Sequence, residues 1–290
     1  MSAHRAQPVL GQALAIAVAA VLGIPAAART GMVCTDTVFV DGFDGAHRSV
    51  GASRAATGTA VAVVSDGSNI FTLDVSAPES LTLVGSSQGS AFGLAFVDGN
   101  FDGVLGLAAD YAVAPDLLAS IRLSDAAITP IGTASPHNGD WHGFKQDPIS
   151  GTLYAVSGCP SASTLYTINR STAAPHTVGV LVGVSCASSL AFDAHGNLFT
   201  IDTGLDELFA IDKSTLGTSL IGPIDFDAGV MDMDFFGATG TLYVAARNNS
   251  MGRSELREMD PQSGATTLIG VIPFDYVTGF AIENAVVCSP

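Results

Sequence analysis

The loop spanning residues 137–142 carries the side chains best suited to binding a ligand. It reads HNGDWH and holds the only tryptophan and two of the six histidines of the chain. An exposed tryptophan beside acidic and amide groups can stack on a sugar ring and hydrogen-bond its hydroxyls. The alternative is that the tryptophan fills a space inside the fold and that the histidines are solvated. The predicted ligand-binding residues are His137, Asn138, Asp140, Trp141 and His142.

The segment from Asp98 to Gly103 has the pattern of a calcium-binding turn. Its sequence, DGNFDG, fits D-x-[DN]-x-D-G, in which alternate residues turn oxygen atoms toward one point and glycine permits a sharp turn. We therefore predict Asp98, Asn100 and Asp102 as ligands of a structural calcium ion. The glutamate usual at the twelfth position is replaced by Ala109, so an ordinary turn between two strands is the alternative.

A second group of carboxylates, Asp225, Asp227, Asp232 and Asp234, lies close together in the chain. Carboxylates that share a site repel one another unless a cation or a shared proton intervenes. Calcium is therefore one interpretation, and solvated loop acids are the favoured one. Because glycosidases use paired carboxylates as acid and base, Asp232, Asp234 and Glu283 are the candidates if the protein is an enzyme.

Other catalytic motifs are weak or missing. Residues 85–89 read GSSQG and formally match G-x-S-x-G. That nucleophile needs a tight turn from a strand into a helix, whereas strand-like segments flank this one on both sides. No zinc-peptidase, phosphate-loop or dinucleotide motif is present. A non-catalytic role is therefore favoured, without excluding an enzyme.

These residues belong to an internal repeat. The segments TLYTINRSTAAPHTVG, ELFAIDKSTLGTSLIG and ELREMDPQSGATTLIG each combine an apolar strand, a polar turn, a second strand and a closing glycine. Weaker copies occur upstream, and the closing glycines recur roughly every 45 residues, a spacing typical of repeat folds. The five closing glycines are Gly85, Gly132, Gly179, Gly222 and Gly270.

A hairpin precedes each of the later strand pairs. The segments GFKQDPISGTLYAV, SLAFDAHGNLFTI and DMDFFGATGTLYVA alternate apolar and polar residues around turn-forming sequences. Each unit therefore contains four antiparallel strands, which we call A to D. Four-stranded units repeated around an axis are typical of a β-propeller.

The two ends of the repeat region complete each other. The last segment, GFAIEN from Gly279, matches strand A but has no B to D after it, and the first unit has B to D without an A. We therefore predict an all-β, five-bladed propeller in which residues 277–283 pair beside residues 59–64. A solenoid is the alternative for any repeat, but it would not need complementary ends.

The amino terminus has the composition of a secretory signal. An apolar run from Ala13 to Ile24 is followed by small residues at Ala26–Ala28. A membrane anchor would need about 20 apolar residues, and this run is shorter. We predict a cleaved signal peptide at 1–28, an N-terminal extension at 29–58, the propeller at 59–290, and a secreted or periplasmic location.

Export favours disulfides for the four cysteines, which permit three pairings. Cys159 lies in a predicted B–C loop and Cys186 in the following D–A loop, and both kinds of loop emerge on one face of a propeller. We therefore predict a Cys159–Cys186 bond. Cys34 and Cys288 would then pair and tie the N-terminal segment to the closing strand.

The run from Trp141 to Cys159, WHGFKQDPISGTLYAVSGC, with the following STLYTIN and LAFDAHGNLFTID, resembles propeller repeat domains of secreted bacterial proteins. Such domains occur alone or appended to extracellular peptidases and surface proteins. The resemblance covers roughly residues 59–290. It implies blade structure and brings no catalytic residues with it.

Composition restricts the partners. A net charge of −16 would repel phosphate backbones and anionic lipids. We therefore expect no nucleic-acid partner and no binding to a membrane surface. No segment after the signal has 18 uncharged apolar residues in a row, so we also expect no membrane span. The favoured role is a non-catalytic propeller that presents a loop face to an extracellular glycan, polymer or protein. An extracellular carbohydrate hydrolase or lyase and a calcium-dependent adhesion or structural role are the alternatives. The further residues expected on that rim are Asp202, Asp206, Arg247, Asn248, Asn249, Asp275 and Tyr276.

Overall fold

The computed structural model describes residues 60–87, 89–111, 116–137, 139–159, 162–237 and 239–283. The predicted signal peptide, the N-terminal extension, Cys34, Cys288 and Asn138 lie outside these residues.

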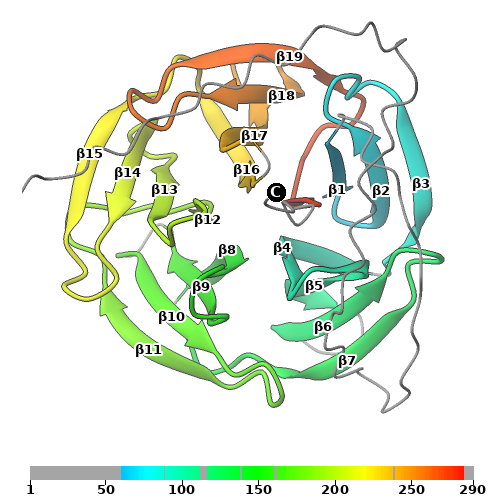
Figure 1. Ribbon diagram of the computed structural model, residues 1–290, viewed down its shortest axis with the longest axis horizontal. Helices are drawn as coiled ribbons and strands as arrows, with labels where there is room; N and C mark the ends of the chain where they lie inside the picture. The colour runs from blue at the N-terminus through cyan, green and yellow to red at the C-terminus, as the bar shows by residue number, and fades with distance from the viewer. Residues whose placement is uncertain are drawn as a thin grey trace, which may run out of the picture. The chain divides into compact units, whose positions relative to one another are not determined.

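Within the described residues, twenty strands form five antiparallel four-stranded sheets arranged around an axis (Figure 1). The first blade contains β20 (Gly279–Ile282), β1 (Val61–Ser65), β2 (Asn69–Asp74) and β3 (Leu81–Ser86). The second contains β4 (Gly89–Val97), β5 (Asn100–Tyr111), β6 (Leu117–Arg122) and β7 (Ile128–Thr133). The third contains β8 (Asp140–Gln146), β9 (Leu153–Gly158), β10 (Thr164–Ile168) and β11 (Pro175–Val180).

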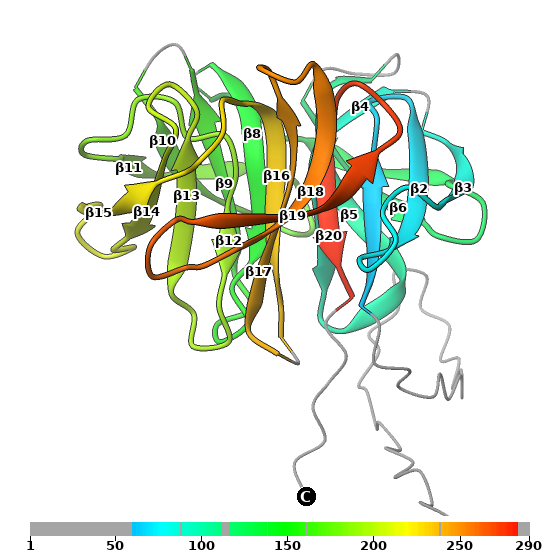
Figure 2. The same cartoon turned by 90° about the horizontal axis from the view of Figure 1, so that it is seen from above.

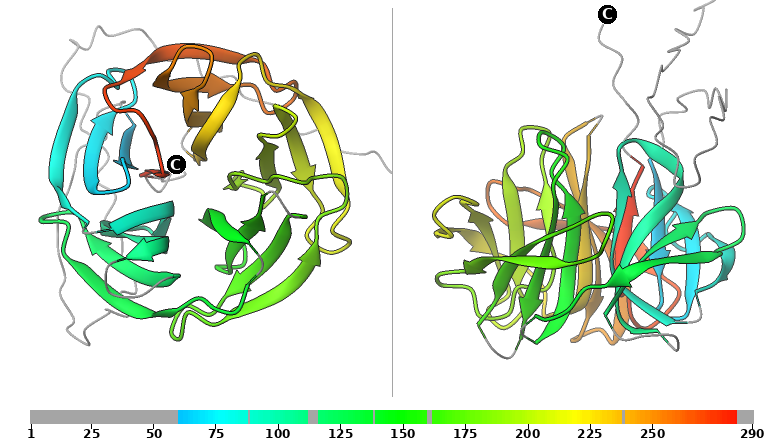
Figure 3. Two further views of the ribbon diagram at one scale, coloured as in Figure 1. Left: turned by 180° about the vertical axis from the view of Figure 1, so that it is seen from behind. Right: turned by 90° about the horizontal axis from the view of Figure 1, so that it is seen from below.

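The fourth blade contains β12 (Ala191–Phe192), β13 (Leu198–Asp202), β14 (Glu207–Ile211) and β15 (Thr218–Pro223). The fifth contains β16 (Ala228–Phe236), β17 (Thr241–Asn248), β18 (Arg253–Met259) and β19 (Thr266–Ile272). In each blade the first-named strand lies innermost, and these five strands surround the axis (Figure 3). The prediction of a five-bladed β-propeller is confirmed.

The ring closes as the chain ends predict. Strand β20 pairs with β1 antiparallel, with Phe280 opposite Val64 and Ile282 opposite Ala62. Strand β20 lies next to β1 on the inner side of the first blade (Figure 1), although more than two hundred residues separate the two strands in the chain. The closing strand therefore gives β1 a hydrogen-bonded neighbour on its inner edge, which would otherwise be open.

The closing glycine of each repeat marks the place where the next blade packs. A Cβ at Gly132 would lie 2.5 Å from the carbonyl oxygen of Thr172, in the turn between β10 and β11. A Cβ at Gly85 would lie 2.9 Å from the carbonyl oxygen of Asp125, in the turn between β6 and β7. The other three closing glycines, Gly179, Gly222 and Gly270, likewise face the turn between the third and fourth strands of the next blade. The repeated glycine is thus a packing requirement between blades.

The hydrophobic core is divided among the interfaces between neighbouring blades. Five main clusters of buried side chains each combine residues of two adjacent blades. In one of them, Phe280 of β20 packs with Leu256 of β18 and Val64 of β1. Each blade therefore depends on both neighbours for the burial of its two faces.

The Cys159–Cys186 disulfide is present, with the two Cα atoms 4.5 Å apart. It joins the connection between β9 and β10 to the segment between β11 and β12. The buried carboxylate of Asp202 accepts hydrogen bonds from the amides of Ser185 at 2.8 Å and Cys186 at 3.2 Å. The segment that carries Cys186 is therefore held in place on two sides.

We expect Phe280→Ala to lower the free energy of unfolding by about 3–5 kcal/mol, because it leaves a cavity at the closure. Leu268→Ala is the matched control, since Leu268 is 42% exposed on the outer strand β19, and it should change stability by less than about 0.5 kcal/mol. Urea unfolding of both variants measures the difference. Equal losses in the two variants would contradict the role assigned to the closing strand.

Candidate functional site

A buried ion pair crosses the ring axis. Lys145 of β8 and Asp232 of β16 lie 2.9 Å apart, with side chains 4% and 0% exposed. The Lys145 ammonium also donates to the carbonyl oxygens of Leu94 in β4, at 2.6 Å, and of Phe280 in β20, at 2.7 Å. All three of its protons are thereby used. One side chain thus connects the innermost strands of four blades.

The carboxylate of Asp232 is held equally closely. Its Oδ2 accepts from the amide of Phe280 at 2.9 Å and lies 3.4 Å from the amide of Leu94, and its Oδ1 accepts from the amide of Met233 at 2.9 Å. Burial raises the pKa of Asp232, while the Lys145 ammonium and the Phe280 amide act in the opposite direction. This pair and its backbone partners, which we call the axial plug, occupy the middle of the ring.

The axial plug separates two recesses at opposite ends of the axis. The chain passes the axial plug at Leu94, Asp232 and Phe280. In all three places the residues that precede these positions in the sequence line one recess, and the residues that follow them line the other. The first, which we call the mouth cup, has a volume of about 260 Å³. It is lined by Asp66, Gly67, Ser68, Phe92, Val230, Tyr276 and Thr278.

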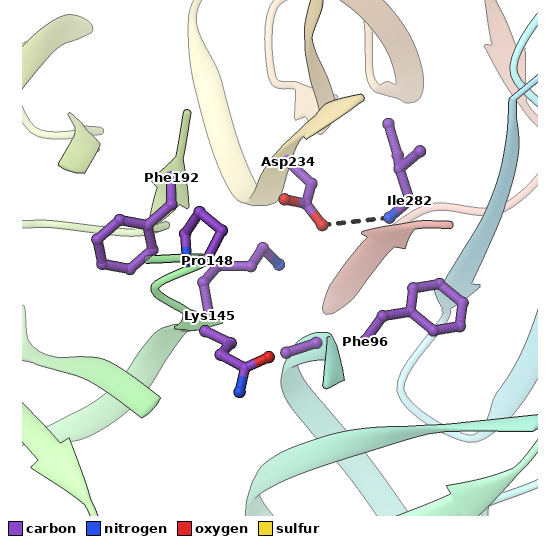
Figure 4. A pocket seen from close by; sticks show the side chains of 8 residues that line it. Phe96, Lys145, Pro148, Phe192, Asp234 and Ile282 are labelled. Carbon is purple, nitrogen blue, oxygen red and sulfur yellow. Dashed lines mark hydrogen bonds between the residues drawn. The ribbon is translucent and has the colours of Figure 1, made fainter. Parts of the chain in front are cut away.

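The second recess, which we call the axial cavity, has a volume of about 50 Å³. Its lining includes Phe96, Lys145, Pro148, Phe192, Asp234 and Ile282 (Figure 4). Since a water molecule occupies about 30 Å³ of liquid, the axial cavity has room for one or two waters. It is too small for a sugar ring.

Two titratable side chains, Lys145 and Asp234, line the axial cavity. Lys145 pairs with Asp232, whereas Asp234 forms no ion pair among the described residues. Its Oδ2 accepts from the amide of Ile282 at 3.2 Å (Figure 4). Its Oδ1 accepts from the amide of Phe235 at 3.0 Å. Burial raises the pKa of Asp234 to about 6, with the Lys145 charge acting against burial and the Asp232 charge adding to it. The surroundings of Asp232 and Asp234 give no support to the alternative of a sugar-cleaving enzyme, since neither carboxylate lines a recess that admits a sugar.

The predicted stacking surface on Trp141 is wrong. The Trp141 side chain is 0% exposed, its Nε1 donates to the carbonyl oxygen of Ala134 at 3.2 Å, and its ring meets the edge of Tyr166 at 5.1 Å. It belongs to the cluster between the second and third blades. The alternative interpretation, in which Trp141 fills a space inside the fold, agrees with the structure.

The other predicted ligand-binding residues of this loop lie around Trp141. His137 stacks on the Trp141 ring at 4.3 Å, and its Nε2 lies 3.0 Å from Oδ1 of Asp116. The ring nitrogens Nδ1 of His137 and Nε2 of His142 are buried without a hydrogen-bond partner in the described part of the chain. Burial lowers the pKa of His142. Asp140 is exposed to solvent.

The predicted calcium turn joins β4 to β5. Oδ1 of Asp98 accepts from Nε2 of Gln146 at 2.7 Å, and Oδ2 pairs with the guanidinium of Arg170. An arginine on this carboxylate supplies the charge that a cation would have supplied. Among the described residues, no group of three or more acidic, histidine or cysteine side chains has the arrangement of a metal site. Calcium at Asp98, Asn100 and Asp102 stays a prediction.

The expected rim residues differ in their surroundings. Asp202 and Asn248 are buried and brace loops. Tyr276 is 50% exposed and lines the mouth cup, and the Arg247 guanidinium lies 4.7 Å from the centre of its ring. Arg247 also donates to the carbonyl oxygen of Asp275 at 2.9 Å. Tyr276 and Arg247 are therefore the expected rim residues that the structure brings to the axis.

Several residues of the mouth cup and the axial plug were missed by the sequence analysis. Phe92, Val230 and Asp66 come from three different blades and belong to no motif. Lys145 had a detectable signal, because a lysine stands in an innermost strand where the other repeats carry apolar or acidic residues. A buried lysine requires a carboxylate partner, and Asp232 was the acid available in the same strand of another repeat.

No protein-family model and no curated protein matches the chain. Among solved structures, the crystal structure of a nidogen/laminin complex contains a chain similar to this one, with 13% identity and a TM-score of 0.48, covering 78% of this chain and 86% of that one. A protein of unknown function from Bacteroides thetaiotaomicron VPI-5482 is similar at 13% identity and a TM-score of 0.45, covering 73% of this chain and 64% of that one. Likeness at this level carries no argument about partners. In the described part of the chain, no helix has the length and hydropathy required to cross a membrane.

We expect Lys145→Met to lower the free energy of unfolding by about 3–5 kcal/mol, because it leaves a buried carboxylate without its cation. Adding Asp232→Asn to that variant should recover part of the loss, since the amide carries no charge and its oxygen still accepts from Phe280. Urea unfolding measures both variants. Arg122→Met, which breaks an exposed pair with Asp125, is the control and should leave stability nearly unchanged, because exposed ion pairs contribute little. A double variant less stable than Lys145→Met alone would contradict the unpaired-charge explanation.

Asp234 should make stability depend on pH. The folded state binds its proton more tightly than the unfolded chain does, since its pKa is raised to about 6. Its contribution to stability is therefore complete below pH of about 4 and is lost as the pH rises through about 6. Urea unfolding of the parent protein and Asp234→Asn should show the parent losing on the order of 2–3 kcal/mol relative to the variant between these limits. A constant difference across that range would show that Asp234 is not perturbed.

Proposed function

We propose that this protein is an exported, non-catalytic β-propeller that binds an extracellular glycan, polymer or protein at the mouth cup. The observation that carries the proposal is the axial plug. Because Lys145 and Asp232 close the axis, the mouth cup is a recess with one opening, and nothing the size of a ligand can pass through the ring. A recess lined by partly exposed aromatic and aliphatic side chains is a common form of binding site.

The size of the mouth cup supports a large partner. Pockets that enclose a whole small molecule measure roughly 300–1,000 Å³, and the mouth cup has about 260 Å³. It therefore suits one group projecting from a partner whose remainder contacts the surrounding loops. Several loops emerge at the same end of the ring as the mouth cup (Figure 2), and we call them together the loop face. They are the loops β1–β2, β13–β14, β15–β16, β17–β18 and β19–β20.

The loop face is held rigid by hydrogen bonds from its own acidic side chains. Oδ1 of Asp206 accepts from the amide of Ala228 at 3.0 Å and so connects two loops. Oδ1 of Asp227 accepts from Nδ2 of Asn249 at 3.0 Å and connects two more segments. A surface already fixed in its bound conformation loses little conformational entropy on binding, which favours recognition.

Export is supported by the composition of residues 1–28 and by the Cys159–Cys186 bond, since disulfides persist in oxidising compartments. The low charge density of the chain and its acidic balance agree with a partner other than nucleic acid.

A panel of neutral, N-acetylated and uronic-acid oligosaccharides, together with short acidic and basic peptides, tests the proposal. We expect at least one class to bind without turnover, with about tenfold or more weaker affinity in Tyr276→Ala, because Tyr276 is the exposed aromatic wall of the mouth cup. Titration followed by nuclear magnetic resonance measures affinity and locates the contact.

His195→Ala is the control, because the His195 side chain is 85% exposed on the turn between β12 and β13, at the opposite end of the ring. It should leave affinity unchanged. Binding that His195→Ala weakens and Tyr276→Ala leaves intact would place the site on the wrong face and refute the proposal, and product formation from any oligosaccharide would replace it with the enzyme alternative.

A further inference from the structure

The walls of the mouth cup are mainly apolar, and the strongest polar group among them is a carboxylate. Phe92, Val230 and Tyr276 supply the apolar walls. The hydroxyl of Thr278 is engaged with Ser65 below the rim, at 3.3 Å from its Oγ. The charge that faces a ligand is therefore that of Asp66, which lies in the loop between β1 and β2.

Asp66 is fixed in position and has no positive partner in the described part of the chain. Its Oδ1 accepts from the amides of Ser68 at 2.8 Å and Asn69 at 2.7 Å, and its Oδ2 accepts from Nδ2 of Asn69 at 3.0 Å. A carboxylate offers about four acceptor positions, so one remains for an incoming donor. A carboxylate held by its own turn is a preorganised acceptor for a cation.

The cations of the described chain are occupied elsewhere. Six of them already contact a carboxylate: Arg122, Lys145, Arg170, Lys213, Arg253 and Arg257. Arg247 lies over the Tyr276 ring and donates to a carbonyl oxygen.

Most carboxylates of the loop face are in the opposite situation. The carboxylates of Asp206, Asp227 and Asp275 form no ion pair among the described residues, whereas Asp225 lies 3.8 Å from Arg257. The whole chain carries a net charge of −16. Such a distribution attracts a positive group to the mouth and repels a negative one.

We propose that the mouth cup binds a lysine or arginine side chain projecting from a protein partner, an inference that rests on the proposed function. The aliphatic part of such a side chain packs on Phe92 and Val230 while its charged end meets Asp66, as amphipathic side chains do at apolar surfaces. Because Arg247 already lies over the Tyr276 ring, the Phe92 ring is the aromatic wall left for a cation–π contact. The axial plug sets the depth, because Lys145 already neutralises Asp232 and repels a second cation from below.

The same chemistry disfavours a sugar in the mouth cup. A sugar ring displays hydroxyls on all sides, and each loses hydration on entering a recess unless a protein group pairs with it. The mouth cup offers the Asp66 carboxylate and the hydroxyls of Ser68 and Tyr276, because the Thr278 hydroxyl is engaged with Ser65, and the remaining side chains of its walls are apolar. A basic side chain needs a single strong acceptor at one end, which is what the lining provides.

The test uses acetylated, amidated pentapeptides with a central lysine, arginine or glutamate between glycines, titrated into the full chain and followed by nuclear magnetic resonance. We expect the lysine and arginine peptides to shift the amide signals of Gly67, Ser68 and Tyr276. Single side chains bind weakly, so dissociation constants on the order of millimolar are expected. The glutamate peptide should bind at least about tenfold more weakly, and raising the salt should weaken the basic peptides.

Asp66→Asn removes the charge and keeps an oxygen for the turn amides, so it should weaken the basic peptides about five- to tenfold without changing the melting temperature. Asp212→Asn is the matched control. Asp212 also holds a turn, accepting from the amide of Ser214 at 2.8 Å, but it lies between β14 and β15 at the other end of the ring. It should leave peptide affinity unchanged.

Equal binding of the basic and acidic peptides, no shift with any peptide, or an unchanged affinity in Asp66→Asn would overturn the inference. If an oligosaccharide then shifts the same amides and Tyr276→Ala weakens it, the proposed function survives with a different ligand. If no probe of either class shifts signals on the loop face, the proposed function fails as well.

Discussion

The contact between a lysine ammonium and an aspartate on the ring axis constrains the rest of this structure. Each charge loses its hydration on burial, at a cost of several kcal/mol per ion. That loss is offset only when every donor and acceptor of the pair is satisfied. Lys145 and Asp232 meet this condition because β4 and β20 bring backbone groups of Leu94 and Phe280 to within 3.4 Å or less. The network therefore favours the closed ring specifically, since an open stack of blades would separate these strands.

The axial plug also divides the space along the ring axis. It turns the axis into two recesses of unequal size, about 260 and about 50 Å³. The smaller one is shielded enough to raise the pKa of Asp234 and has no space for an organic ligand. The larger one opens among loops that the blades hold at fixed positions, and loops on a rigid scaffold are where binding residues commonly lie. The contact that stabilises the ring thus also separates the proposed binding site at one end from the small cavity at the other.

The prediction of Trp141 as an exposed residue failed for a local reason. The sequence was interpreted as a loop up to His142 with a strand from Gly143, whereas β8 begins at Asp140. Trp141 therefore lies within the strand, opposite Ser157 of β9, where its side chain points into the space between two blades. Strand ends are poorly defined by residue pattern alone, since a bulge at this point of β8 interrupts the alternation on which the pattern depends.

The fold itself could be derived from the residues because its determinants are local and repeated. Alternating apolar positions, turn sequences and the closing glycines recur in every blade, and the incomplete first and last units left one way to finish the ring. The Cys159–Cys186 pairing followed from that register. The mouth cup and the partnership of Lys145 with Asp232 could not be derived in this way, because they join residues from different blades that share no motif. Only the tertiary structure brings Asp66, Phe92 and Tyr276 to one recess, since contacts across the axis depend on the angle at which each blade meets the next, and no local pattern encodes that angle.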